Sequence, residues 1–196
     1  MRHWILSLAV LALVASPALA GKLKIGDKAP SFEGLPAVEG GQDSSLTLSD
    51  IKEDVVVVVF LANHCPAVIA TEDRFIDLAG AFKGKSVKFV GISVSDQKGV
   101  DDIAGIKKHE KKYNFVYGYD ESQKVGKDYG AVKTPTCYVL DKDRTVRYIG
   151  APDNSVMAET KVTKTYLKDA VDAVLAGKDV PVTETNAQGC GISYTK

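Results

Sequence analysis

Three cysteines are the residues of this 196-residue chain best suited to covalent redox chemistry. Cys65 stands in an Asn-His-Cys-Pro sequence directly after an apolar run, and the following Pro66 suits the first turn of a helix. We therefore expect the Cys65 thiol at a helix N-terminus, where free N–H groups and the helix dipole favour the thiolate. The thiolate is the nucleophile of disulfide exchange and of peroxide reduction. The alternative is an inert thiol buried beneath the end of a strand.

The residues that could assist Cys65 are less well defined by their surroundings. His64 could add positive charge beside the thiol when it is protonated. Cys190 lies between two glycines, so it could swing onto the helix end as a resolving thiol or form a structural disulfide that fixes the tail. Cys137 lies in an apolar run and is expected in the core, although its place two residues after Pro135 keeps it as a third candidate.

The element that must position Cys65 is a strand buried on both faces. Residues 55–61 read VVVVVFL, a continuous run rich in β-branched side chains that predicts a central strand of a parallel or mixed sheet covered by helices. After Pro66, apolar residues recur at helical spacing as far as Phe82, and Gly84 closes the segment. The pattern therefore predicts strand, turn and one helix, with Cys65 in the turn.

Beyond this unit the chain continues to alternate strands and helices. Strands are expected over residues 87–94, 115–117, 136–140 and 145–149, and helices over residues 103–113, 121–129 and from 167 to a stop at Gly177. The last two strands form a hairpin, and the helical connections between parallel strands require right-handed crossovers. Residues 21–50 are expected to be an irregular arm with a helix start signal at residues 49–50.

The first twenty residues have the pattern of a cleaved secretory signal. Arg2 precedes an apolar stretch that is shorter than the ~20 residues needed to span a bilayer, and small residues lead to a cleavage site after Ala20. We therefore expect residues 21–176 to form one domain, followed by a tail, residues 177–196, that carries Cys190. Export to the periplasm or the extracellular space would place all three cysteines where disulfides are stable.

Several segments together are similar to the thioredoxin superfamily, and within it to the redoxin branch called AhpC/TSA. They are residues 24–32 (KIGDKAPSF), the strand and turn ending in Cys65, and residues 133–136 (KTPT). The likeness runs from about Gly21 to about Ala176. It extends to the tail in a subgroup of exported proteins with Asn-His-Cys-Pro, a segment like residues 150–154, and a Gly-Cys near the C-terminus.

This resemblance implies an α/β thioredoxin-like fold with a central mixed sheet flanked by helices. It also implies thiol-based redox chemistry at Cys65, with a cis Thr134–Pro135 bond against the active thiol and a backbone there that pairs with an extended substrate segment. From the residues alone, Pro135 could equally be a trans proline that begins a strand. The partners implied are a protein disulfide or a peroxide and an external thiol reductant, with no cofactor or resident metal.

Two departures from the family patterns bear on the activity. Thioredoxins carry a Cys-x-x-Cys motif, whereas Val68 occupies the position of the second cysteine in this chain. Peroxiredoxins have a Thr or Ser three residues before the reactive cysteine and a Pro four residues earlier, where this chain has Ala62 and Val58. The hydroxyl that would orient a peroxide is missing. Thiol–disulfide exchange is therefore favoured over fast peroxide reduction.

Other function classes are excluded or kept as alternatives. The formal net charge is zero, which provides no electrostatic footprint for nucleic acid or for an anionic membrane. A binding module that keeps the fold and has lost turnover remains an alternative, as does a thiol-based metal chaperone. Copper chaperones of this fold carry a Cys-x-x-x-Cys motif. Ile69 occupies the position of its second cysteine here, so a metal site at His64 would need Cys190 or Cys137 as a ligand. His109 is expected on a solvated helix face, and Asp153 in a turn.

Overall fold

The centre of the computed structural model, which describes residues 23–109 and 113–195, is a seven-stranded mixed sheet. Its order is β2-β1-β5-β4-β3-β7-β8, in which β3, β4 and β5 are parallel and the other pairings are antiparallel. The strands are β1 (Leu35–Glu39), β2 (Gln42–Leu46), β3 (Val55–Leu61), β4 (Val87–Ser93), β5 (Val116–Tyr119), β7 (Thr136–Leu140) and β8 (Val146–Gly150). The expected mixed α/β architecture is confirmed.

The strand β3 is buried along its whole length, as its composition predicts. Side chains alternate between the two faces of a strand, so Val55, Val57 and Val59 join one apolar cluster while Val56 and Val58 join the other. Neighbouring strands pair with β3 on both edges, β4 in parallel and β7 antiparallel. Both faces of the sheet must therefore be covered, and the carboxyl end of β3 is the first point at which polar residues can leave the core.

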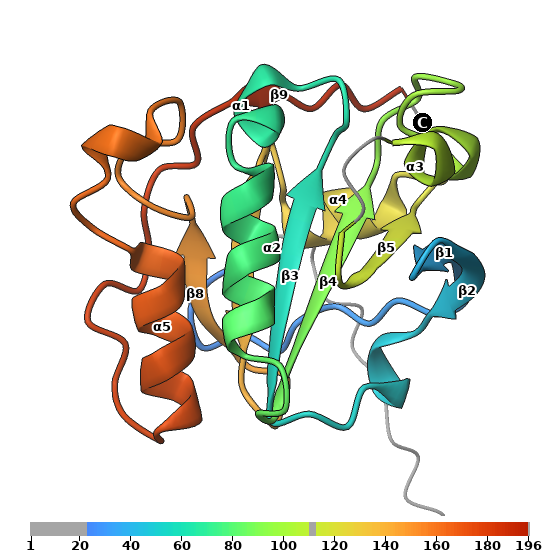
Figure 1. Ribbon diagram of the computed structural model, residues 1–196. Helices are drawn as coiled ribbons and strands as arrows, with labels where there is room; N and C mark the ends of the chain where they lie inside the picture. The colour runs from blue at the N-terminus through green and yellow to red at the C-terminus, as the bar shows by residue number, and fades with distance from the viewer. Residues whose placement is uncertain (1–22, 110–112, 196) are drawn as a thin grey trace, which may run out of the picture.

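Helices cover the two faces unequally. The face with Val57 is covered by α2 and α5, which lie in front of the sheet in Figure 1, and α3 contributes Ile106 to the same cluster. The opposite face is covered by α4 and by the segment before β3, through Leu48 and Ile51. The helices are α1 (Pro66–Ile69), α2 (Glu72–Ala81), α3 (Ile103–Lys108), α4 (Lys124–Tyr129) and α5 (Tyr166–Leu175), with short 3₁₀ turns at Leu48–Asp50 and Glu159–Lys161.

The single helix expected after Pro66 is divided into α1 and α2, and this prediction was wrong. Thr71 lies at the break, where its hydroxyl donates to the carbonyl oxygens of Ala67 at 2.8 Å and Val68 at 2.9 Å. Its backbone N–H also donates to the Val68 carbonyl, a tighter bond than the α-helical one. Cys65 is therefore followed by one helical turn, so the helix dipole at the thiol is that of a short segment rather than of a long helix.

The arm expected over residues 21–50 contains a β-hairpin, which is a second correction. The strands β1 and β2 pair antiparallel, and β1 also pairs with β5, so the hairpin extends the central sheet. Gly40 and Gly41 make the turn with φ of 57° and 81°, values that favour glycine. The helix start signal at residues 49–50 corresponds to a 3₁₀ turn.

Further boundaries differ from the expected ones. The helix expected over residues 103–113 ends at Lys108, and the helix expected from residue 121 begins at Lys124. The tail, for which no regular structure was expected, contributes a short strand β9 (Cys190–Gly191) that pairs with β6 (Lys133–Thr134). The expected signal segment, residues 1–20, lies outside the described residues. None of the helices in the described part of the chain is long and apolar enough to cross a membrane.

We predict that Val57→Ala lowers the free energy of unfolding by about 2 kcal/mol, because it removes buried methyl groups and leaves a cavity in the sheet core. Equilibrium urea denaturation followed by circular dichroism measures the change. Val132→Ala is the matched control, since the same atoms are removed from a side chain that is 64% exposed. Equal losses in the two variants would contradict the burial of β3 as the main support of the fold.

Candidate functional site

The site is built around a disulfide between Cys65 and Cys190, which are 125 residues apart in the chain. Their Cα atoms are 5.9 Å apart. Cys65 caps the N-terminus of α1, its N–H donating to the carbonyl of Ala62 and its carbonyl accepting from Ile69, both at 3.0 Å. The Cys65 side chain is fully buried, whereas Cys190 is partly exposed. Solvent therefore reaches the bond from the side of Cys190.

The cis-proline loop forms the other wall of the disulfide. The Thr134–Pro135 peptide bond is cis, in agreement with the resemblance, and the Thr134 carbonyl oxygen lies 3.3 Å from Cys65 Sγ. Thr134 is also the residue that faces Cys190 in the β6–β9 ladder. Four of the predicted site residues, the two cysteines with Thr134 and Pro135, thus lie together although they come from three separate segments.

The tail is held on both sides of Cys190 by hydrogen bonds that do not involve sulfur. Before the cysteine, Thr185 N–H donates to the Ile149 carbonyl at 3.0 Å. After it, the buried Gln123 amide donates to the Ser193 carbonyl at 3.0 Å and accepts from Thr195 N–H at 2.8 Å. The Gly-Cys-Gly segment is therefore an extended strand fixed at each end rather than a freely swinging tail.

His64 is oriented by a buried carboxylate that the sequence pattern did not reveal. Its Nδ1 lies 2.5 Å from Oδ2 of Asp101, whose side chain is fully buried. The other oxygen of Asp101 accepts the backbone N–H of Asn63 at 2.6 Å and, more weakly, that of His64 at 3.4 Å. Asn63 in turn donates its side-chain amide to the Val100 carbonyl at 2.7 Å. One carboxylate thus fixes both the backbone of the turn before Cys65 and the imidazole ring.

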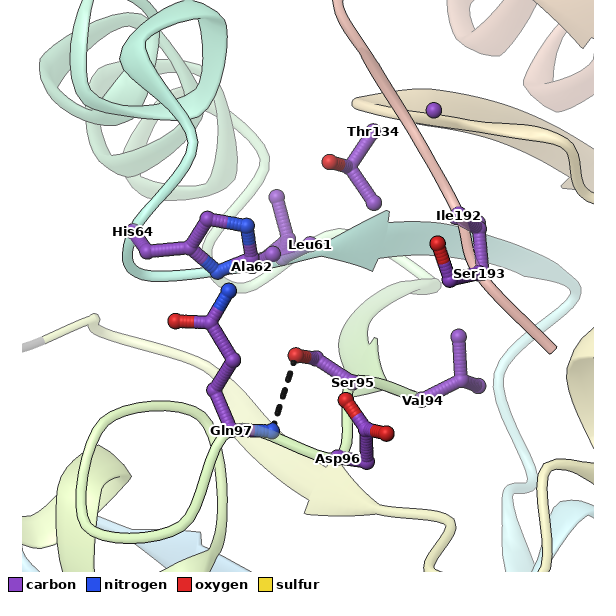
Figure 2. A pocket seen from close by; sticks show the side chains of 11 residues that line it. Leu61, Ala62, His64, Val94, Ser95, Asp96, Gln97, Thr134, Ile192 and Ser193 are labelled. Atoms are coloured by element: carbon purple, nitrogen blue, oxygen red, sulfur yellow. Dashed lines mark hydrogen bonds between the residues drawn. The ribbon is translucent and has the colours of Figure 1, made fainter. Parts of the chain in front are cut away.

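A small pocket of about 90 Å³ lies between His64 and the tail. Figure 2 shows the His64 ring reaching into it from the turn, with Gln97 and Ser95 below and Ile192 and Ser193 on the side of the tail. Thr134 and Gly191, the immediate neighbours of the disulfide in the β6–β9 ladder, also line it. The complete lining is Leu61, Ala62, His64, Val94, Ser95, Asp96, Gln97, Thr134, Gly191, Ile192 and Ser193.

Residues 25–149 match the family model for AhpC/TSA, and this match spans more than half of the chain. The chain belongs to the AhpC/TSA family. It is 27% identical over 127 residues to the thiol-disulfide oxidoreductase ResA of Bacillus thuringiensis subsp. konkukian, covering 64% of this chain and 68% of that protein.

Solved structures agree with the family assignment at the level of the fold. A conserved, uncharacterized protein of Geobacillus kaustophilus is 34% identical, with a TM-score of 0.80 over 88% of this chain and 93% of that one. A Chlorobium tepidum protein assigned as thiol:disulfide interchange protein DsbE has a TM-score of 0.61 at 22% identity, over 79% of this chain and 99% of its own. The fold of this AhpC/TSA protein is thus thioredoxin-like.

The third cysteine of this AhpC/TSA protein is outside the disulfide. Cys137 is free and buried in β7, opposite Val59 of β3. Burial raises the pKa of the Cys137 thiol well above its ordinary value, and the negative charge of Asp153 adds to this shift. The interpretation of Cys137 as a core residue is confirmed. Among residues 23–109 and 113–195, no group of three or more His, Cys, Asp or Glu side chains is arranged to hold a metal ion.

Two polar residues outside the disulfide site form ion pairs with buried partners or are themselves buried. His109 was predicted on a solvated face, but its Nε2 lies 2.6 Å from the buried Glu72, so that prediction was wrong. Asp153, predicted in a turn, is buried and forms an ion pair with Arg74. Arg74 also donates to the Ala70 carbonyl at 2.9 Å, and so ties the end of α1 to the segment after β8. Each pair joins segments far apart in the chain.

We predict that Gly189→Ala lowers the free energy of unfolding of the oxidised protein by about 2 kcal/mol or more. Gly189 has φ of 146°, and a Cβ there would lie 2.0 Å from the Thr134 carbonyl oxygen, so the strand pairing at the disulfide must shift. Gly191→Ala is the control, because nothing lies within 4 Å of its added Cβ. Urea denaturation of both variants measures the difference, and equal stability would contradict the close contact of the tail with the cis-proline loop.

We predict that Cys137 does not react with iodoacetamide in the folded, oxidised protein at pH 8. Its raised pKa keeps the buried thiol protonated at a pH where an exposed cysteine, with a pKa of about 8.5, is partly thiolate. Mass spectrometry before and after addition of urea counts the modified thiols. Rapid modification of Cys137 without unfolding would contradict its place in the core.

Proposed function

We propose that this AhpC/TSA protein is an exported thiol–disulfide oxidoreductase that works through Cys65 and Cys190. The observation that carries the proposal is the position of their disulfide against the cis-proline loop, with the tail paired along β6. The likeness to a protein named thiol-disulfide oxidoreductase ResA supports the same reaction class. The signal-like pattern of residues 1–20 and the disulfide itself support an oxidising compartment outside the cytoplasm.

In the proposed cycle, Cys65 is the nucleophile of the reduced protein. Its thiolate attacks one sulfur of a substrate disulfide, a bond forms between Cys65 and that sulfur, and the other substrate sulfur leaves as a thiolate. Cys190 then attacks Cys65 and releases the reduced substrate, which regenerates the bond seen between the two cysteines. Because the tail covers Cys65, an extended substrate segment takes the place of β9 on the edge of β6 during the first step.

An external thiol restores the reduced protein. Cys190 is the more exposed sulfur, so the external thiolate attacks it first, and Cys65 leaves as a thiolate. A second thiolate then attacks the mixed disulfide at Cys190 and leaves the protein with two reduced cysteines and one external disulfide. Peroxide is a slower alternative substrate for Cys65, because Ala62 occupies the position where a peroxide-orienting hydroxyl would be needed.

One observation favours a second candidate, a peptide-binding module in which the disulfide is structural. The tail is anchored on both sides of Cys190, by Ile149 on one side and by Gln123 on the other, as in a segment that a disulfide merely clamps. The two candidates differ in whether the bond turns over under mild thiol reductants.

We predict that Cys65→Ser abolishes the reduction of a protein disulfide, with insulin as substrate and dithiothreitol as reductant, because the nucleophile is lost. Cys190→Ser, reduced and then freed of dithiothreitol before it is mixed with insulin, should leave a mixed disulfide on Cys65 that accumulates, since neither the resolving thiol nor an external thiol is present. Turbidity of insulin measures turnover, and mass spectrometry of the acid-quenched protein measures the adduct. Cys137→Ser is the control and should keep wild-type turnover, because that thiol is buried outside the disulfide.

Two outcomes would contradict the proposal. Full turnover in Cys65→Ser would remove Cys65 from the mechanism. A wild-type disulfide that resists dithiothreitol until the protein unfolds would favour the structural role and the binding module.

A further inference from the structure

The pairing of His64 with Asp101 resembles a catalytic arrangement more than a surface ion pair. Asp101 is fully buried, and its two oxygens are engaged by the Asn63 backbone and by Nδ1 of His64. The His64 side chain remains 35% exposed and lines the pocket beside Thr134 and Gly191. With Nδ1 held by the carboxylate, Nε2 is the nitrogen left for a molecule that enters the pocket (Figure 2).

The pocket borders residues next to the disulfide, so a thiol bound in it would lie beside that bond. Thr134 and Gly191 line it, and in the β6–β9 ladder Thr134 faces Cys190 while its carbonyl lies 3.3 Å from Cys65 Sγ. Only the thiolate of an incoming thiol is nucleophilic, and a thiol of ordinary pKa is largely protonated at neutral pH. A base in this pocket would therefore accelerate the attack.

We propose that His64 is the general base that deprotonates a small external thiol as it attacks Cys190, and that Asp101 is the positioning residue that holds the imidazole in the required tautomer. The arrangement follows the physical logic of an Asp-His pair that serves a nucleophile. Asp101 accepts a hydrogen bond from the Nδ1–H of His64, which leaves the Nε2 lone pair toward the pocket, and its negative charge stabilises the imidazolium that forms during the step. The inference deepens the proposed function, since it concerns the step that reduces the protein.

The step balances in protons and electrons. Nε2 of His64 takes the proton of the external thiol, the thiol sulfur forms a bond with Cys190 Sγ, and the bond between Cys190 and Cys65 breaks. The electron pair of that bond stays on Cys65, which leaves as a thiolate. The proton on His64 then passes to the Cys65 thiolate or to solvent, and the base is restored.

The charged groups that face His64 come from two neighbouring segments. Asp101 comes from the segment that leads into α3, and Asp96 from the segment after β4, where it lines the same pocket. Both are acidic. The Asp101 carboxylate contacts the His64 ring, whereas the Asp96 carboxylate lies 3.5 Å from the Thr195 hydroxyl in the tail. Histidine is the side chain whose ordinary pKa suits a base near neutral pH.

The test measures how fast 2-mercaptoethanol reduces the protein's own disulfide across a pH series. In the wild type the rate should fall less steeply toward acid pH than the thiolate fraction does. In His64→Gln and Asp101→Asn the rate should follow the thiolate fraction alone, at least about 10-fold below the wild type when the thiol is protonated. The more acidic thiol trifluoroethanethiol is already a thiolate at the alkaline end of the series. There the wild type, His64→Gln and Asp101→Asn should react with it at rates that agree within about 2-fold.

A merely structural role would move the rates differently. Loss of a packing contact would change the rate by the same factor at every pH and with both thiols, and that result would overturn the proposal, as would a wild-type profile in His64→Gln. Asp172→Asn, which removes an exposed carboxylate on α5, is the matched control and should keep the wild-type profile. If Asp101→Asn fails to fold, His64→Gln alone decides, because its side chain is partly exposed.

The readout separates this inference from the proposed function. Reduction of the resident disulfide by a small thiol requires no physiological substrate. A wild-type protein that shows the pH signature but does not reduce insulin would retain the His64 base and lose the proposed oxidoreductase activity. A protein that reduces insulin but lacks the pH signature would retain the proposed oxidoreductase activity and would contradict the role of His64 as a base.

Discussion

Burial of β3 on both faces is the constraint on which the rest of the structure depends. Its seven side chains are essentially inaccessible to solvent, so helices must cover both sides of the sheet. Polar residues of this segment can therefore occur only after the strand has ended. Asn63, His64 and Cys65 follow at that point, at the carboxyl end of a central strand. The chemistry is therefore concentrated at one edge of the sheet because no other part of this segment can hold polar groups at low cost.

The tail is bound to this end of the sheet by two kinds of bond, of which only one depends on the redox state of the cysteines. The disulfide at Cys190 can be broken by thiols, whereas the backbone pairing at Thr134 and the bonds of the Gln123 amide do not depend on the redox state of sulfur. A tail held in this way keeps Cys190 near Cys65 after reduction, so the effective concentration of the resolving thiol stays high. Anchoring on both sides is thus compatible with turnover, provided that the few residues around Cys190 can separate from β6.

The sequence predicted those features that depend on local patterns. The run of valines identifies β3, the resemblance implies the cis Thr134–Pro135 bond, and the glycines that flank Cys190 indicate a tail able to form the disulfide with Cys65. The break at Thr71 was missed because a hydroxyl that turns back on its own helix leaves the apolar spacing unchanged. The β1–β2 hairpin was missed although the paired glycines at residues 40–41 are a hairpin signal. Asp101 contacts His64 across 37 residues of chain and Gln123 contacts Ser193 across 70, and at such separations periodicity and composition carry no information.

Asp101 shows how the fold combines two requirements in one group. Burial of a carboxylate costs several kcal/mol unless hydrogen bonds and a partner charge offset it. Here the offset comes from the Asn63 N–H and the His64 ring, which belong to the turn that presents Cys65. The backbone that positions the thiol and the imidazole that faces the pocket are therefore both held by the Asp101 carboxylate. If either shifts, the buried carboxylate loses a hydrogen bond that offsets its desolvation. An apolar side chain at this position would leave both the Asn63 N–H and the His64 ring without their partner, so one buried acid serves the turn and the imidazole together.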